Sequence, residues 1–170
     1  MALNNLITIR NIILWRHAEA VALFNTDDMV NVDVVNDDMN RALTNNGLRQ
    51  AKKMARWLDD NLPSNISLHC SPALRTFQTA QALDLKINMH QAFKPNTSLP
   101  LVLNKIADLP QQQNLLLVGH QPWMGQLAAH LLGINDAELS VKKGAIWWLR
   151  LSQAEPAHYQ ILTVQTPSML

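Results

Sequence analysis

Apolar residues form short continuous runs along the chain, and these runs alternate with segments in which apolar residues recur every three or four positions. Six runs have strand length: 9–15, 66–70, 87–93, 115–118, 145–151 and 158–165. The segments of helical spacing are 45–62, 72–83, 99–109 and 122–132. This alternation predicts one α/β domain over 1–170, a three-layer α/β/α sandwich whose sheet is mostly parallel with an antiparallel strand at the C-terminal end.

Two helix starts have recognisable capping residues. Thr44 precedes a segment in which Leu48 and later apolar residues share one face, so Thr44 is predicted to cap that helix. Ser71 followed by Pro72 has the cap-then-proline pattern of a second helix start. The 18–43 segment has no sustained period, and we interpret it as a long loop or lid because such connections are uncommon unless functional. Its aspartates are Asp27, Asp28, Asp33, Asp37 and Asp38.

Composition narrows the class of protein. The 170 residues are 48% hydrophobic and carry a net charge of +1, so no global field favours nucleic acid or an anionic membrane. Cys70 is the single cysteine, which excludes an internal disulfide and a structural zinc site built from paired cysteines. No run approaches the about 18 apolar residues of a membrane-spanning helix. No cleaved signal is expected either, so the predicted location is the cytoplasm.

Polar residues follow three of the predicted strands. Arg16 and His17 follow the first, and His120 follows the run at 115–118. Ser71 follows the second strand, with Arg75 one turn into the next helix. Because the carboxyl ends of strands in open α/β sheets form the ligand crevice, these side chains are predicted to converge. Guanidinium forks suit phosphate oxygens and helix N-termini favour anions, so the set predicts a phosphoryl site without a metal.

Three segments resemble sequence blocks of the histidine phosphatase superfamily. They are LWRHAEA at 14–20, SPALRTFQTA at 71–80 and VGHQPWMGQLA at 118–128. The short length, the Arg41-Ala-Leu-Thr44 element followed by Gly47, and GAIWWL at 144–149 are similar to the small SixA-type phosphohistidine phosphatases. The resemblance covers about residues 12–151 and implies a phosphoglycerate-mutase-like fold.

The resemblance also implies roles at matching positions. His17 would be a nucleophile that is transiently phosphorylated on a ring nitrogen, with no cofactor. Arg16, Arg75 and His120 would neutralise the transferring phosphoryl group, and Arg41 would be a further basic residue near the pocket. Physical chemistry agrees, because phosphoryl transfer depends mainly on positioning and electrostatics, and nearby arginines lower the pKa of a histidine nucleophile.

Two departures from the family pattern bear on the reaction. Ala18 stands where the superfamily usually has glycine, and we expect it to add only a methyl group rather than to need φ > 0. No Asp or Glu occurs between Asp84 and Asp108, where ester-cleaving branches carry the acid that protonates a leaving alkoxide. An imidazole can leave with a proton already on its other nitrogen, so the absence favours a P–N bond. Glu19 is the alternative proton carrier, and Glu19 and Ser71 are further candidate substrate-binding residues.

The predicted function is therefore a metal-independent phosphatase that acts on protein phosphohistidine, with a histidine phosphotransfer domain of a signalling system as the expected partner. The 45–62 helix has a basic stripe, which is a solvated face or a docking site for an acidic phosphoprotein: Arg49, Lys52, Lys53 and Arg56. The other histidines are assigned no role: His69, His90, His130 and His158.

Three alternatives stay open at this point. The chain could be a phosphatase of small phosphate esters, which requires a carboxyl group near the leaving oxygen, supplied by the acidic 18–43 segment. It could be a phosphoprotein-binding domain without turnover, with Ala18 as the sign of lost activity. A metal hydrolase is the weakest alternative, because the aspartates cluster in one loop without the histidine–carboxylate spacing typical of such sites.

Overall fold

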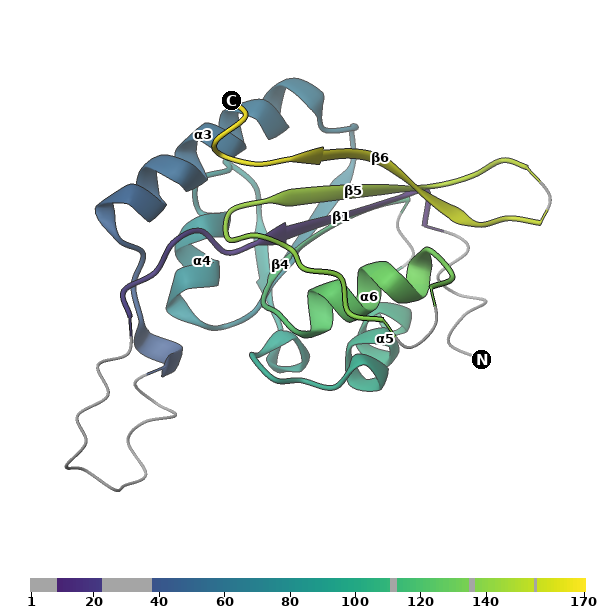
Figure 1. Ribbon diagram of the computed structural model, residues 1–170, viewed down its shortest axis with the longest axis horizontal. Coiled ribbons are helices and arrows are strands. Elements are labelled where there is room, and N and C mark those ends of the chain that lie inside the picture. The colour runs from purple at the N-terminus through teal and green to yellow at the C-terminus, as the bar shows by residue number, and fades with distance from the viewer. Residues whose placement is uncertain (1–8, 23–37, 111–112, 135–136, 155) are drawn as a thin grey trace.

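The computed structural model describes residues 9–22, 38–110, 113–134, 137–154 and 156–170 (Figure 1). A six-stranded sheet crosses this part of the chain in the order β3-β2-β4-β1-β5-β6. The strands are β1 (Asn11–Arg16), β2 (Ile66–Cys70), β3 (Ile87–Met89), β4 (Asn114–Gly119), β5 (Ile146–Leu151) and β6 (Tyr159–Gln165).

The pairing of the strands confirms the predicted α/β class. Strands β3, β2, β4 and β1 run parallel, whereas β5 pairs antiparallel with β1 and β6 pairs antiparallel with β5. The two strands that are neighbours in sequence near the C-terminus therefore form the predicted antiparallel end. Parallel strands need both faces covered, and every residue of β4 is buried.

Helices cover both faces of the sheet and complete three layers (Figure 1). On one face, α3 (Asn45–Asn61) and α4 (Leu74–Ala80) pack against inward side chains of β1, β2 and β4. On the other, α5 (Leu99–Ala107) and α6 (Trp123–Leu131) pack against the alternate residues of β1 and β4. Ile12 and Leu14 lie in the second core and Ile13 and Trp15 in the first, as the period of two along a strand requires.

The first of these helices begins as predicted but presents a different face. The Thr44 hydroxyl accepts a hydrogen bond from the Gly47 N–H at 2.9 Å, so Thr44 is the N-cap. Leu48, predicted on the apolar face, is 47% exposed, which makes that prediction wrong. Gly47 is buried instead, because its turn lies so close to Glu19 that an added Cβ would be 1.9 Å from the Glu19 carbonyl oxygen.

The predicted start of the next helix is also wrong. Helix α4 begins at Leu74, and its N-cap is Ala73, which provides no side-chain hydrogen bond. The Ser71 hydroxyl instead makes a hydrogen bond with the His120 ring. The third predicted strand is also shorter than expected: the run 87–93 is a strand only as far as Met89, and a 3₁₀ turn follows, η1 (Gln91–Phe93).

Most of the predicted 18–43 loop lies outside the described residues, together with Asp27, Asp28, Asp33 and Asp37. The described residues at its two ends form regular secondary structure. Ala20 forms an isolated antiparallel bridge with Leu43, and residues 38–40 form a helical turn. Within the described ranges, none of the helices has the length and apolar character needed to span a membrane.

Candidate active site

The sheet brings the predicted residues together along the edge that is formed by the carboxyl ends of its parallel strands. Residues Arg16 and Gly119 are register partners in the parallel β1–β4 pair, and the His17 N–H donates to the Gly119 carbonyl at 3.1 Å. Ser71 continues from β2 in the same way, since its N–H donates to the Val118 carbonyl at 3.1 Å. The neighbouring parallel strands β2, β4 and β1 therefore end at the same level of the sheet, as the strand pattern predicts.

A cavity of about 490 Å³ opens at this edge. Five candidate residues from the sequence line it: Arg16, His17, Arg41, Arg75 and His120. Asp38, Met39, Lys94, Pro95, Asn96 and Gln121 complete the lining. The described lining thus has four cationic side chains against one carboxylate, so the cavity is suited to an anion.

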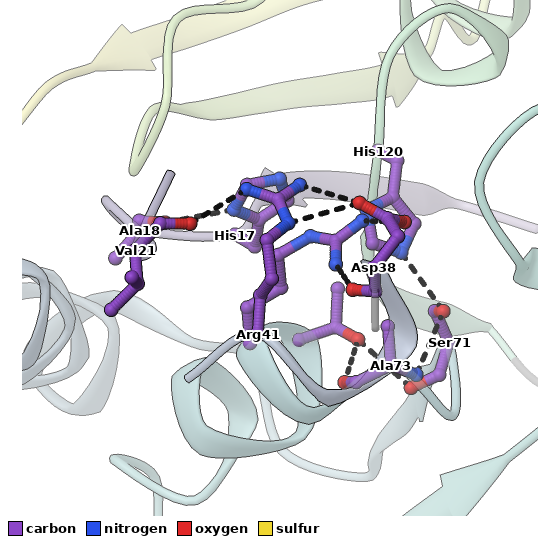
Figure 2. A network of polar contacts seen from close by, with 10 residues as sticks. His17, Ala18, Val21, Asp38, Arg41, Ser71, Ala73 and His120 are labelled. Carbon is purple, nitrogen blue, oxygen red and sulfur yellow. Dashed lines mark hydrogen bonds and ion pairs between the residues drawn. The ribbon is translucent and has the colours of Figure 1, made fainter. Parts of the chain in front are cut away.

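His17 is held in one tautomer. Its Nδ1 lies 2.8 Å from the Ala18 carbonyl oxygen, which can only accept, so Nδ1 carries the proton and Nε2 keeps its lone pair (Figure 2). The side chain is buried, and that burial, followed by the charges of Arg75, Arg16 and Arg41, lowers its pKa to about 3. His17 is therefore a neutral imidazole at neutral pH, which is the nucleophilic form.

Ala18 does not disturb this arrangement. The described non-glycine residues with positive φ are Asn65 and Asn96, so Ala18 does not need the conformation that favours glycine, as expected from the sequence. Its side chain is fully buried, and its N–H donates to the Thr79 hydroxyl at 3.1 Å. The added methyl group packs into the core and leaves the carbonyl free to hold His17.

His120 is positioned by Ser71. The His120 Nε2 lies 2.9 Å from the Ser71 hydroxyl oxygen, which also accepts the Ala73 N–H at 3.2 Å (Figure 2). We assign the hydroxyl hydrogen to the bond with Nε2, which places the ring proton on Nδ1. Nδ1 is buried without a partner among the described residues. Burial, then His17 and the arginines, lowers the pKa of His120 to about 2, so the ring is a neutral donor.

The arginines differ in how they are held. Arg16 donates from Nη1 to the Val141 carbonyl at 2.6 Å, whereas Arg75 is 2% exposed and faces Asp38. Burial lowers the pKa of both guanidinium groups, although each stays charged at neutral pH. In both, Nε is buried without a hydrogen-bond partner in the described part of the chain. Because both arginines line the cavity, these unpaired donors are candidates to bind a ligand's oxygens.

Asp38 and Lys94 are the charged residues of the described lining that the sequence analysis did not assign to the pocket, and Asp38 is the one that contacts the arginines. Its carboxylate contacts Arg41 at 2.8 Å and Arg75 at 3.1 Å (Figure 2). Burial acts in the opposite direction, but the two arginines hold the pKa of Asp38 below its usual value. The spacing of three residues between Asp38 and Arg41 was the available signal, because such pairs face each other on a helical turn.

Glu19 does not line the cavity. Its carboxylate accepts hydrogen bonds from the Thr44 hydroxyl at 2.6 Å and from the Asn46 amide at 3.0 Å, and these bonds lower its pKa. This placement ties the chain after His17 to the start of α3 and does not favour a role for Glu19 in proton transfer. Among the described residues, no three His, Cys, Asp or Glu side chains are placed to hold one metal ion.

Comparison with known proteins adds a family match and similar folds. The family described as histidine phosphatase superfamily (branch 1) matches residues 12–96, half of the 170-residue chain. Two solved structures described as SixA phosphohistidine phosphatases superpose over nearly the whole chain. The one from Agrobacterium tumefaciens has a TM-score of 0.72 at 20% identity, covering 94% of this chain and 99% of its own. The one from Nakamurella multipartitia has a TM-score of 0.69 at 25% identity, covering 93% and 96%.

An ester phosphatase has a similar fold. A structure from Escherichia coli described as an alpha-ribazole-5'-P phosphatase has a TM-score of 0.65 at 20% identity, covering 91% of this chain and 96% of its own. At 20% identity, a likeness of this kind concerns the fold. The choice between a P–N and a P–O substrate must therefore be argued from the side chains of this chain.

Proposed function

The chain belongs to the histidine phosphatase superfamily, and from that premise, together with the similarity of its fold to SixA structures, we propose that it hydrolyses phosphohistidine on a protein, without a metal ion. The proposed nucleophile is Nε2 of His17. Arg16, Arg75 and Arg41 bind the oxygens of the phosphoryl group, and Nδ1–H of His120 donates to one of them. The phosphatase activity follows from the family, and the substrate class is the proposal.

In the first step, the Nε2 lone pair of His17 attacks phosphorus, and the bond between phosphorus and the substrate's imidazole nitrogen breaks. The electron pair of that bond stays on the substrate ring, which leaves as neutral imidazole when its other nitrogen already carries a proton. In the transition state, negative charge is spread over the three equatorial oxygens, and the guanidinium groups and His120 stabilise it by hydrogen bonds to those oxygens. A histidine with a pKa of about 3 does not have to lose a proton before it attacks.

In the second step, water attacks the phosphorus of phosphorylated His17. The Nε2–P bond breaks, its electron pair returns to Nε2, and the attacking water loses a proton to solvent as inorganic phosphate forms. Throughout this cycle Nδ1 keeps its proton, because the Ala18 carbonyl at 2.8 Å accepts it as a hydrogen bond. A phosphorylated imidazole with a proton on its other nitrogen is cationic, and it therefore leaves readily. The covalent intermediate divides one displacement into two easier ones.

The observation that carries the choice of substrate is the state of Asp38. It is the carboxyl group in the described lining of the cavity, and Arg75 and Arg41 keep its pKa below the usual value. An ionised carboxylate held by two guanidinium groups is a poor proton donor to an alkoxide. Phosphohistidine needs no such donor, so the site is better matched to a P–N bond than to a sugar or alcohol phosphate.

The proposed partner is a histidine phosphotransfer domain, which places the protein in cytoplasmic signalling. The basic stripe on α3 supports a protein partner, because its four side chains are exposed and lie on the helix whose first turn contacts Glu19, two residues after His17: Arg49, Lys52, Lys53 and Arg56. Exposed charges of this kind steer association and depend on ionic strength.

The test offers the purified chain a phosphorylated phosphotransfer domain and, in parallel, a panel of sugar and alcohol phosphates. We expect the phosphoprotein to be hydrolysed at least about 100-fold more efficiently in kcat/KM, with activity unchanged by a chelator. A preference for the panel would overturn the substrate class and leave the nucleophile in place. Phosphate release that persists in His17→Ala, or that a chelator abolishes, would overturn the mechanism itself.

A further inference from the structure

Asp38 holds the fork of Arg75 on which a phosphoryl group would bind. Its backbone carbonyl accepts from Nη1 of Arg75, and its carboxylate Oδ2 contacts Nη2 at 3.1 Å. Two parallel contacts to the terminal nitrogens of one guanidinium form the geometry in which arginine binds a phosphate. Asp38 therefore already occupies the two terminal nitrogens of Arg75 that the proposed mechanism assigns to the substrate's phosphoryl group.

The same carboxylate also satisfies Arg41. Its Oδ1 accepts from Nε of Arg41 at 2.9 Å and lies 2.8 Å from Nη2. The carboxylate of Asp38 thus lies between two guanidinium groups, where it neutralises part of the positive charge that lines the cavity (Figure 2). The contact is accessible to solvent rather than sealed, since the side chain of Asp38 is 25% exposed and that of Arg41 is 20% exposed.

Arg16 provides the contrast within the site. It is anchored by the carbonyl of Val141, a neutral acceptor that lies outside the lining of the cavity. Arg16 therefore brings an uncompensated charge to the phosphoryl position. Arg75 brings a charge that is already paired, and a ligand anion gains it only by sharing or displacing the carboxylate.

We propose that Asp38 is an internal counterion that competes with the incoming phosphoryl group for Arg75 and Arg41, so that the carboxylate sets the anion affinity of the site. This inference rests on the cavity being the phosphoryl site of the proposed function. A competing counterion weakens the binding of substrate and of product phosphate alike. It also keeps the guanidinium groups of Arg75 and Arg41 paired when the cavity is empty, which reduces the repulsion between them.

The test is the affinity for sulfate, which is doubly charged over the working pH range and is not turned over. By titration calorimetry at neutral pH and fixed ionic strength, Asp38→Asn should bind sulfate about tenfold more tightly than the natural chain, which equals about 1.4 kcal/mol. Asp38→Ala should change the affinity in the same direction. The matched control is Asp84→Asn, which removes the same charge from an exposed residue outside the lining and should change the affinity less than twofold.

The sign of the effect separates competition from support. If Asp38 instead holds Arg75 in position for the ligand, both Asp38 variants will bind sulfate more weakly, and that result overturns the proposal, as does an unchanged affinity. Sulfate binding that fails in the natural chain and in every variant would overturn the proposed function along with it. Tighter binding in Asp38→Asn, together with no hydrolysis of phosphohistidine, would support the counterion and reject the function.

Discussion

The pair His17 and His120 and the pair His69 and His90 have nearly the same spacing, with ring centroids 5.1 Å and 5.0 Å apart. Each pair also lines a cavity. In the second pair the rings bond to each other, with Nδ1 of His69 lying 2.8 Å from Nε2 of His90. In the first, each ring bonds instead to a separate anchor, the Ala18 carbonyl or the Ser71 hydroxyl.

The difference lies in what remains available for chemistry. Both ring nitrogens of His69 are used, because its Nε2 also lies 2.6 Å from the Ser67 hydroxyl. His17 keeps one lone pair and lines a cavity with four cations, whereas the described lining beside His90 has one cation, Lys105, and one carboxylate, Asp108. Proximity of two histidines is therefore a weak signal. A free lone pair next to uncompensated positive charge is what suits a ring to phosphoryl transfer.

Removing one histidine from each pair should give the largest contrast. We expect His17→Ala to lower the hydrolysis of a phosphoramidate at least about 10³-fold, because the nucleophile is lost. His90→Ala should stay within about threefold of the natural chain, since His90 is half-buried and away from the described lining of the active-site cavity. Initial rates at saturating substrate are the measurement, with circular dichroism to verify the fold. Equal losses in both variants would contradict the distinction between the pairs.

The second contrast concerns stability against pH. The pKa values of His17 and His120, about 3 and 2, lie below the usual 6.5, so between pH 6.5 and 3 the unfolded chain binds protons that the folded chain does not. The contribution of these two rings to the free energy of unfolding is therefore fully present above pH 6.5, and it is lost progressively as the pH falls below that value. From pH 7 to 5, each ring should cost about 1–2 kcal/mol of unfolding free energy.

Urea unfolding at the two pH values measures this slope. His17→Gln should lose less stability than the natural chain on acidification, because one of the two buried rings no longer titrates. His90→Gln should keep nearly the full loss of stability. Burial and Lys105 also lower the pKa of His90, but its ring is only half-buried, so it should contribute less to the pH dependence than His17 does. A natural chain with no loss of stability between pH 7 and 5 would show that the active-site rings take up protons while folded.

Much of this site was predictable because it depends on strand geometry. Once the runs ending at Arg16, Cys70 and Gly119 are taken as parallel strands, the sheet must gather the residues that follow them. The position of Asp38 was not predictable in the same way, since its partner Arg75 lies 37 residues away and the contact depends on how the two segments pack. A long-range ion pair leaves no periodic pattern in the sequence.

Two errors in the helix predictions have local causes. Ser71 has the sequence features of an N-cap, but its hydroxyl bonds to His120, 49 residues away, and the helix begins three residues later. Leu48 has the correct spacing for the apolar face of α3, but Gly47 faces the core because the backbone of Glu19 approaches it closely. In both cases, a tertiary contact made by the active-site segments overrides a local preference.

The serine next to each pair offers a third, smaller contrast. Ser71→Ala removes the hydroxyl that fixes the ring proton of His120 on Nδ1, so we expect turnover to fall about tenfold through loss of one positioned donor. Ser67→Ala removes the corresponding hydroxyl beside His69 and should change turnover less than twofold. Separate values of kcat and KM are the measurement. A loss in Ser67→Ala equal to that in Ser71→Ala would indicate that the second pair takes part in catalysis.

The smallest effect is expected at Ala18, where the carbonyl rather than the side chain serves the first pair. Ala18→Gly keeps the acceptor for His17 Nδ1 and the N–H that donates to Thr79, so turnover should stay within about twofold. The variant should lose about 1 kcal/mol of unfolding free energy, because glycine is more flexible and a buried methyl group is removed. Denaturant unfolding and kcat/KM measure the two quantities. A tenfold gain in turnover would instead mean that the methyl group obstructs the nucleophile, which would favour a domain that binds phosphoproteins and has lost most of its activity.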